Sequence, residues 1–296
     1  MPLLQKITLL SLMLATLTAC QTSQISQNPN PQTPKPYPWQ SPSHALTNDM
    51  SLRAKIVQVA KDEHQTWGSP FLDTNGRLAK YRSLEADHTP LANGNMAWQQ
   101  VMSYWYDSGA LQTVPNYENL HCQSVGLSAR HNSCRFFVLD VAWSAAFISY
   151  VMTQAGVPDF AVSARHFDYL AQAYRGVGAY RLGDPKAVSP QLGDMLCYVR
   201  GRDDMTGFAD FSEYLASAKK WLPAHCDIVV ERHDNELWLI GGNVLNGVTL
   251  RKIATDDKGV AILPSKSDNV CTPNDETACN FNRQTWVAVM SLGNEW

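Results

Sequence analysis

The chain has 296 residues, of which 45% are apolar and 10% are aromatic. A chain of this length and composition can bury a full core, so we expect one globular domain of about 200–250 residues. The formal net charge is −3, and no long basic run occurs. These two features argue against nucleic acid as the main binding partner.

The N-terminal residues have the organisation of a secretory signal. Lys6 supplies a positive charge, a short apolar stretch follows it, and small residues precede Cys20. The sequence Leu-Thr-Ala-Cys that ends at Cys20 resembles the lipobox of bacterial lipoproteins. This resemblance implies removal of residues 1–19 and membrane attachment through a lipid on Cys20. Gln21 follows in place of the aspartate typical of inner-membrane retention, so we expect an outer-membrane anchor and a domain that faces the periplasm.

Residues 20–46 form a second region, which is rich in Pro, Gln, Ser and Asn. Such a composition favours extended, partly polyproline backbone, so this region is predicted to be a tether between the membrane and the domain. Residues 47–296 are predicted to form a single domain, with folded structure from about Asn48.

Apolar side chains recur at helical spacing in the first half of this domain and again beyond its centre. Helices are predicted at residues 52–67, 96–106, 164–174 and 211–220. Strand-like alternation replaces this spacing in the C-terminal third. Strands are predicted at residues 192–199, 226–230, 236–240, 248–250 and 286–290. The pair Asn246-Gly247 predicts a hairpin. Helices first and antiparallel strands afterwards predict an α+β fold, in which N-terminal helices pack on a C-terminal antiparallel sheet.

Residues 140–158 are apolar around most of a helix circumference, which predicts a helix buried in the core. Asp140 is its expected N-cap, and Gly156 is its expected C-terminal cap. Ser144 would then lie in the first turn, beside unpaired backbone N–H groups and the positive end of the helix dipole. Many folds place a nucleophile there, and an ordinary buried serine is the alternative.

Six cysteines follow Cys20, and an even number in an exported protein indicates disulfide bonds. They are Cys122, Cys134, Cys197, Cys226, Cys271 and Cys279. Short polar loops separate the first two and the last two, so each of these is a predicted pair. Cys197 and Cys226 pair by elimination or stay as buried thiols. A zinc site built from them with His225 and His233 is a further alternative, but the spacings match no compact ligand motif, so no metal or other cofactor is expected.

His225 and Asn243 are the first candidates for catalysis. A turn centred on Asp234 would place them opposite each other in the ladder, with Cβ atoms roughly 5 Å apart. Asn243 could then hydrogen-bond the imidazole and fix its tautomer. A two-residue turn would instead place Val244 opposite His225. An oriented His225 could act as base for a hydroxyl at the start of the buried helix, and Ser144 fits that description.

The segments around these residues resemble papain-like bacterial cell-wall hydrolases of the NlpC and CHAP groups. The similar segments are WSAAFISYVMTQAG for the nucleophile helix, LGDMLCYV for the Gly-Asp strand, and HCDIVVERHDNELWLIGGNV for the His-led strand and its return. The similarity covers residues 140–255, and the whole chain also resembles a bacterial family catalogued as a domain of unknown function. The resemblance implies a papain-like fold and an amidase or endopeptidase acting on peptidoglycan. It assigns Ser144 as nucleophile, His225 as base and Asn243 as orienting residue.

Ser144 stands where these hydrolases carry cysteine, and a serine depends fully on a positioned base. Three functions therefore stay open. They are amide hydrolysis in peptidoglycan, a catalytically degenerate module that binds wall fragments or a protein, and acyl transfer on an ester or lipid. His166 and Trp143 are candidates for lining the cleft. A structural histidine and a core tryptophan are the alternatives.

Overall fold

A computed structural model describes residues 42–293, apart from 81–82, 118–119, 121–128, 203, 218–219 and 267–270. The predicted signal peptide, Cys20, most of the tether and Cys122 therefore lie outside the described residues. All described residues belong to the same unit, Pro36–Trp296.

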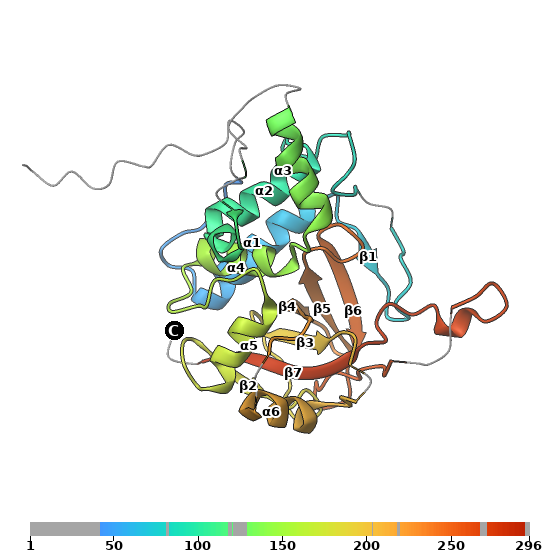
Figure 1. The fold of residues 1–296 in the computed structure, drawn as a ribbon. Coiled ribbons are helices and arrows are strands. Elements are labelled where there is room, and N and C mark those ends of the chain that lie inside the picture. The colour runs from blue at the N-terminus through green and yellow to red at the C-terminus, as the bar shows by residue number, and fades with distance from the viewer. Residues whose placement is uncertain are drawn as a thin grey trace, which may run out of the picture. The chain divides into compact units, whose positions relative to one another are not determined.

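The first half of this unit is helical, as Figure 1 shows. Its helices are α1 (Leu52–Thr66), α2 (Ala97–Ser108), the 3-10 turn η1 (Ala110–Thr113), α3 (Ala129–Asp140), α4 (Ser144–Ala155) and α5 (His166–Tyr174). Helix α6 (Phe208–Ser217) and the 3-10 turn η3 (Glu276–Ala278) come later. Local capping helps to start these helices: the Ser51 hydroxyl accepts the N–H of Ala54, and the Gln99 side chain accepts the N–H of Met96. The four helices predicted from spacing are confirmed, with ends shifted by a few residues.

Among the described residues, seven strands form one sheet in the order β1-β6-β5-β4-β3-β7-β2. They are β1 (Phe71–Leu72), β2 (Tyr180–Gly183), β3 (Met195–Val199), β4 (Ala224–Arg232), β5 (Glu236–Gly241), β6 (Thr249–Ala254) and β7 (Thr285–Leu292). β1 runs parallel to β6, and the other neighbours are antiparallel. Most helices precede most strands, so the predicted α+β fold is confirmed.

The two faces of the sheet contribute to different cores. One face packs with the helices into the larger core, which includes Cys226 and Ile228 of β4. The other face carries a smaller cluster that includes Tyr198, Val229 and Trp286. Neighbouring residues of a strand alternate between faces. Consequently Cys226 lies on the helix side, while His225 lies against Tyr198 with ring centroids 5.0 Å apart.

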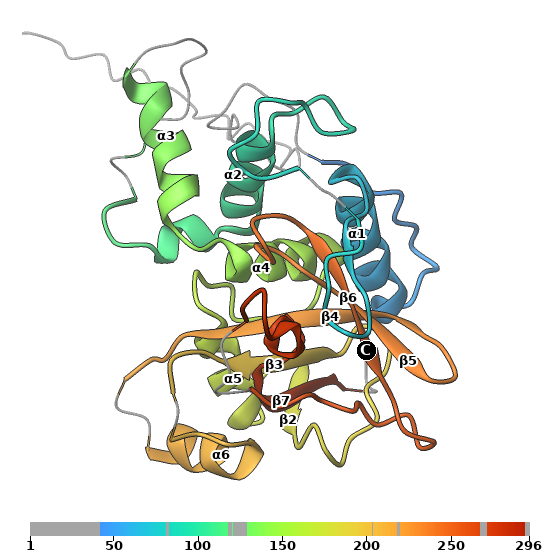
Figure 2. The same cartoon turned by 90° about the vertical axis from the view of Figure 1, so that its right-hand side faces the viewer.

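Helix α4 lies between α2 and the sheet in both views (Figures 1 and 2). Every residue from Ser144 to Met152 is buried. The predicted core position of this helix is therefore confirmed. Among the described residues, no single helix is long and apolar enough to cross a membrane; α3 and α4 satisfy that test only as a pair bent by 101°.

A sharp bend replaces the predicted start of this helix. The prediction placed one helix over residues 140–158 with Asp140 as N-cap, whereas α3 ends at Asp140 and α4 begins at Ser144. Periodicity did not reveal the break because residues 141–142, which form it, are apolar as well. The other end is as predicted, since Gly156 caps α4 in the left-handed conformation at φ 76°.

Two disulfide bonds join described cysteines. Cys271–Cys279 closes a short loop, and Cys197–Cys226 links directly paired residues of β3 and β4. Both predicted pairs are confirmed, and the zinc alternative loses its two thiolates. Among the described residues, no group of three or more His, Cys, Asp or Glu side chains is placed to hold a metal ion. Cys134 is also disulfide-bonded, and Cys122, its predicted partner, lies outside the described residues.

His44 attaches the N-terminal segment to the domain. Its Nδ1 atom lies 3.1 Å from Asp62 Oδ2 of α1, and its Nε2 atom lies 2.8 Å from Tyr150 Oη of α4. The buried carboxyl of Glu63 lies 3.5 Å from the same Nε2 atom. The chain therefore packs on the domain before the predicted boundary at residue 47.

Candidate active site

Ser144 is the first residue of α4 and is 6% exposed. Its N-cap residue, Trp143, makes no side-chain hydrogen bond to the helix. The first backbone N–H groups of α4 therefore have neither an intrahelical acceptor nor a side-chain cap. Together with the helix dipole, such groups can stabilise a negative charge placed beside the Ser144 hydroxyl.

His166, the first residue of α5, contacts Ser144. The distance from His166 Nε2 to Ser144 Oγ is 2.7 Å. Two serines hold the loop before α5: the Ser149 hydroxyl of α4 donates to the carbonyl oxygen of Ser163 and accepts its N–H, each at 3.1 Å. The Ser163 hydroxyl then donates to Asp168 of α5 at 2.5 Å. This serine clamp, Ser149 and Ser163, brings the first residue of α5 against the first residue of α4.

A pocket of about 650 Å³ opens beside Ser144 and His166. Most of its wall is apolar and comes from the bend before α4 and from the segment that leads into β4. Its other polar side chains are Thr113, Arg165 and Arg200. A hydroxyl, an imidazole and unpaired helix N–H groups on one pocket wall are the parts that acyl transfer requires.

The imidazole of His166 is neutral at neutral pH. Burial lowers its pKa well below the ordinary value, and the neighbouring His225 and Arg200 lower it further. A neutral ring can accept the hydroxyl proton of Ser144. The other ring nitrogen, Nδ1, hydrogen-bonds the hydroxyl of Tyr169 on the same helix. Burial raises the pKa of Tyr169 well above its ordinary value, so this hydroxyl stays protonated.

His225 lies behind His166, with ring centroids 5.0 Å apart, and is fully buried. Its Nε2 atom lies 2.7 Å from Asp227 Oδ1, and Arg200 Nη2 lies 3.5 Å from its Nδ1 atom. An arginine can only donate hydrogen bonds, so Nδ1 is the acceptor, and Nε2 carries the proton that is donated to Asp227. Burial lowers the pKa of His225 although Asp227 opposes the shift. This ring is therefore neutral too.

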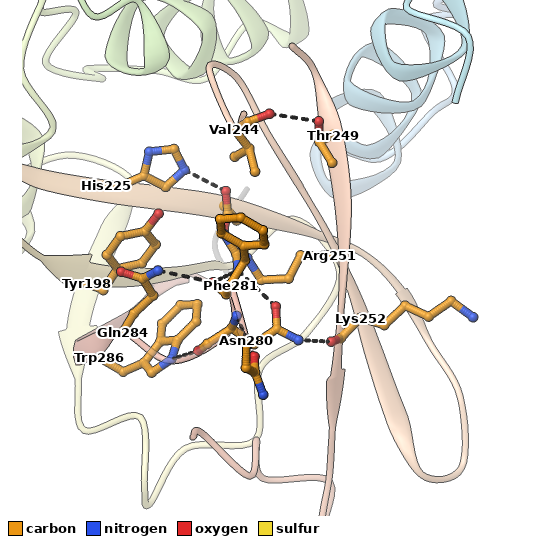
Figure 3. Close-up of polar contacts among 12 residues, drawn as sticks. Tyr198, His225, Val244, Thr249, Arg251, Lys252, Asn280, Phe281, Gln284 and Trp286 are labelled. Atoms are coloured by element: carbon orange, nitrogen blue, oxygen red, sulfur yellow. Dashed lines mark hydrogen bonds and ion pairs between the residues drawn. The ribbon is translucent and has the colours of Figure 1, made fainter. Parts of the chain in front are cut away.

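Asp227 also binds Arg251, whose Nε atom lies 3.1 Å from Asp227 Oδ2. Arg251 also donates to the carbonyl oxygen of Phe281 at 2.6 Å, and Figure 3 shows these two residues together. Burial alone would raise the pKa of Asp227, but His225 and Arg251 outweigh it and lower that pKa. The carboxylate is therefore ionised and orients His225.

The structure joins Ser144 to His166, whereas the sequence predicted a contact with His225. Among the described residues, the hydrogen-bond partner of Ser144 Oγ is His166, and His225 bonds Asp227 instead. His166, a candidate for lining the cleft with a structural histidine as the alternative, is one of the pocket residues. Its contact with Ser144 makes His166 the candidate base. His225 lies behind His166 and, among the described residues, is not a hydrogen-bond partner of Ser144.

Asn243 does not face His225 in the ladder. The predicted register is present where Ile228 pairs with Ile240, but β5 ends at Gly241. Asn243 lies beyond that end, in the connection to β6, at a left-handed φ of 55°. Among the described residues, the carboxylate that hydrogen-bonds the imidazole of His225 is that of Asp227.

Trp143 does not line the pocket. It is fully buried and stacks on Trp67, with ring centroids 5.5 Å apart. The core alternative for this tryptophan is the one that the structure supports. Its ring fixes the start of α4 from the core side.

Two glycines allow the end of β5 to approach the site. A Cβ atom at Gly241 would lie 1.8 Å from Asp227 Oδ1 and 3.0 Å from His225 Nε2. A Cβ atom at Gly242 would lie 2.4 Å from the Cβ atom of Phe147 in α4. Both positions therefore require glycine because there is no space for a side chain. Gly241 leaves room for the His225–Asp227 contact, and Gly242 leaves room for the packing of α4.

Sequence reasoning missed three residues of the site. Asp227 follows His225 by two positions, and that spacing places both on one face of a strand. Tyr169 follows His166 by three positions, and that spacing places both on one side of a helix. These two signals were available. No spacing signal indicated Arg200, because it lies in the loop that follows β3.

Comparison with known proteins finds a family match over the part of the chain that contains this site. Residues 92–292 match the family described as "Uncharacterized protein conserved in bacteria (DUF2272)". The match extends from the loop before α2 to the last residue of β7, so it contains Ser144, His166 and Asp227. No match is found among curated proteins or among solved structures. Because the matched residues make up more than half of the chain, this protein belongs to the bacterial family DUF2272.

Proposed function

We propose that this protein is a serine hydrolase of the bacterial cell envelope that cleaves amide bonds in the stem peptides of peptidoglycan. The observation that carries the proposal is the 2.7 Å contact between Ser144 Oγ and His166 Nε2. It occurs at a helix start without a side-chain cap, on the wall of a pocket large enough for a peptide segment.

Ser144 and His166 perform the two steps of acyl transfer. Ser144 Oγ attacks the amide carbonyl carbon while His166 Nε2 takes the hydroxyl proton. The resulting oxyanion lies beside the unpaired N–H groups at the start of α4. His166 then returns the proton to the leaving amine, and the acyl group stays on Ser144 as an ester. Water, activated by the same ring, hydrolyses that ester and restores the serine.

His225 and Asp227 support this cycle from behind. His166 becomes positively charged when it takes the proton, in a buried setting that disfavours charge. The ionised Asp227 lies one ring further back, bonded to His225. Its negative charge offsets part of that cost, and the buried imidazole of His225 keeps the space behind His166 filled.

The order of α4, β3 and β4 supports a papain-like origin of the fold, whereas the proposed base, His166, lies on α5 and outside the His-led strand of that order. Helix α4 comes first, then the Gly193-Asp194 turn into β3, and then β4 with His225 near its start. NlpC and CHAP hydrolases have a similar order of motifs. The apolar N-terminal stretch and the Leu-Thr-Ala-Cys sequence support the location. In this proposal, lipidated Cys20 anchors the protein in the outer membrane, and the domain faces the peptidoglycan.

Turnover of isolated peptidoglycan by the protein in detergent micelles tests the proposal. The wild type is compared with Ser144→Ala and Ser144→Cys, and Ser217→Ala on the exposed side of α6 is the matched control. Loss of peptide release in Ser144→Ala alone is the expected result. Release that is unaffected by Ser144→Ala rejects the serine mechanism, and release by Ser144→Cys alone indicates a degenerate enzyme. Preference for ester over amide substrates would reassign the site to acyl transfer on esters or lipids.

A binding module is the second candidate, and the contact between Tyr169 and His166 favours it. Tyr169 is fully buried, and among the described residues its hydroxyl bonds only His166 Nδ1. If Tyr169 donates this bond, Nε2 carries a proton and donates to Ser144, so the ring cannot accept the serine proton. The opposite direction leaves a buried hydroxyl hydrogen unpaired, at a cost of about 1–3 kcal/mol.

The variant Tyr169→Phe separates the two candidates. It removes the hydroxyl whose donation to Nδ1 keeps the proton on Nε2. The Nε2 atom of His166 is then free to accept the serine proton, so a hydrolase should retain its turnover number or increase it. A binding module shows no turnover in either form, and it retains peptidoglycan in a pull-down even after His166→Gln. A loss of turnover in a folded Tyr169→Phe protein would mean that the hydroxyl accepts from Nδ1 and assists the base.

A further inference from the structure

The pocket wall combines positive charge with apolar surface. Arg165 and Arg200 lie on it and are exposed. None of its described lining residues is acidic. Arg165 is neutralised by Asp168, with Arg165 Nη2 lying 3.1 Å from the carboxylate. No described carboxylate lies within ion-pair distance of Arg200, which contacts Tyr198 and His225 instead.

Arg200 is held in place by groups that do not neutralise it. Its Nη2 atom lies 3.3 Å from Tyr198 Oη and 3.5 Å from His225 Nδ1. Its guanidinium carbon lies 5.5 Å from the centre of the Tyr198 ring, and its backbone N–H donates to Pro223. Among the described residues, nothing accepts a hydrogen bond from Nε or Nη1 of this side chain. A positioned guanidinium with free donors matches the geometry of a carboxylate.

We propose that Arg200 binds a free carboxylate of a peptide substrate and that the exposed Trp221 covers the adjoining part of the peptide. This inference deepens the proposed function, on which its catalytic part rests. Contacts lead from Arg200 through His225 and His166 to Ser144. Two side chains therefore separate Arg200 from the nucleophile, and both Arg200 and Ser144 line the same pocket.

The exposure of the rim favours a peptide over an alkyl chain. Trp221 is 54% exposed, and the guanidinium of Arg165 lies 5.9 Å from its ring. A ligand at such a rim stays partly in water, and a peptide tolerates this because its amides are solvated. An alkyl chain binds through complete burial of its surface. The carboxylate supplies the ion pair, and the ring supplies a flat contact for the chain beside it.

Binding to the Ser144→Ala protein tests the inference without turnover. The probes are N-acetyl-alanyl-alanine with a free C-terminal carboxylate and the same peptide as its carboxamide, compared by calorimetry. We expect the carboxylate to bind about 10-fold more tightly, because charge-assisted hydrogen bonds to Arg200 are lost in the carboxamide. Arg200→Gln should abolish the difference. Arg175→Gln, at an exposed arginine outside the pocket, should preserve it.

Three results would overturn the inference. They are equal affinity for the two peptides, no binding of either peptide, and an unchanged preference in Arg200→Gln. Tighter binding of octanoate than of the peptide carboxylate would overturn the assignment to peptides. Peptidoglycan turnover distinguishes this failure from that of the proposed function. Ser144-dependent release without a carboxylate preference rejects only the role of Arg200, whereas a preference without any turnover rejects only the hydrolase.

Discussion

The site contains two polar regions that differ in charge and in access to the pocket. Ser144 and His166, the reactive pair of the proposed function, are neutral and lie on the pocket wall. The ionic network, His225, Asp227 and Arg251, lies behind it in the sheet, and two of its members form an ion pair. Breaking a buried ion pair is costly because one charge is left without a partner. Altering a neutral pair leaves no buried charge without a partner, so its structural cost should be smaller. Activity and stability should therefore depend on different residues of the same site.

The largest expected effect is on the reactive pair. His166→Gln should lower kcat/KM on peptidoglycan about 10³-fold, because the amide side chain cannot take a proton from Ser144. The free energy of unfolding should fall by about 1–3 kcal/mol, because the buried Tyr169 hydroxyl loses its partner on the ring. His233→Gln, at an exposed histidine of the β4–β5 turn, serves as control. An equal loss of activity in both variants would contradict the assignment of His166.

The ionic network should show the reverse behaviour. Asp227→Asn leaves Arg251 buried without its carboxylate partner, so the free energy of unfolding should fall by about 3–5 kcal/mol. Urea denaturation measures this loss. Asp204→Asn removes the carboxylate of the exposed pair with Arg202 and should leave the midpoint unchanged. If Asp227→Asn unfolds at the same urea concentration as the wild type, the network contributes no structural support.

Glu63 is a buried carboxyl that, unlike Asp227, has no arginine partner among the described residues. Its effect on the pH dependence of stability can therefore be compared with that of the ionic network. Glu63 is buried against Tyr104 and Gln100, and burial raises its pKa to about 7 despite their hydrogen bonds. Between its ordinary pKa and about 7, the folded protein binds this proton more tightly than the unfolded chain does. Stability from this group is therefore greatest at low pH and falls by about 3 kcal/mol as the pH rises through that range.

Urea denaturation between pH 5 and pH 8 measures this effect, and Glu63→Gln should flatten the dependence. Glu213→Gln, on the exposed part of α6, is the matched control. His166 contributes a pH dependence of stability with the opposite sign. Its pKa is lowered in the folded state, so its contribution to stability is lost as the pH falls below its ordinary value. A pH dependence that survives Glu63→Gln unchanged would contradict the assignment to this carboxyl.

The smallest expected effect concerns the serine clamp, which couples structure to the reactive pair. Ser149→Ala removes one donor and one acceptor for the backbone of Ser163, and it should lower the free energy of unfolding by about 1 kcal/mol. Because the loop also positions His166, kcat should fall while KM changes little. Ser217→Ala removes an exposed hydroxyl that bonds its own helix and should change neither quantity. Unchanged kcat in Ser149→Ala would show that α5 is positioned without the clamp.

Local patterns predicted the elements well, and the failures lie where the chain changes direction. The spacing of apolar residues located most of the described helices and strands but missed α3, β1 and β2, and Gly156 marked the end of α4. The bend at residues 141–142 escaped because those residues are as apolar as their neighbours. The predicted register is correct at Ile228 and Ile240. Sequence alone did not show that β5 ends at Gly241 or that a register shift follows Val229.

The site was predicted in part. Ser144 and His225 were both identified, and they do lie in one region, each next to His166. The contact between Ser144 and His166 decides the candidate base. It depends on the position of the loop before α5, which is held by hydrogen bonds between Ser149 and Ser163. Two buried serines fourteen positions apart carry no periodic signal. The role of His166 was therefore out of reach of spacing arguments.

His44 has a mechanical consequence. In the described segment before α1, its ring contacts Tyr150 of α4 and Asp62 of α1. A pull on that segment therefore loads α4 and α1 before it reaches any strand of the sheet. The loaded helix α4 carries Ser144 at its start. A force along this segment is therefore transmitted to the helix that positions Ser144.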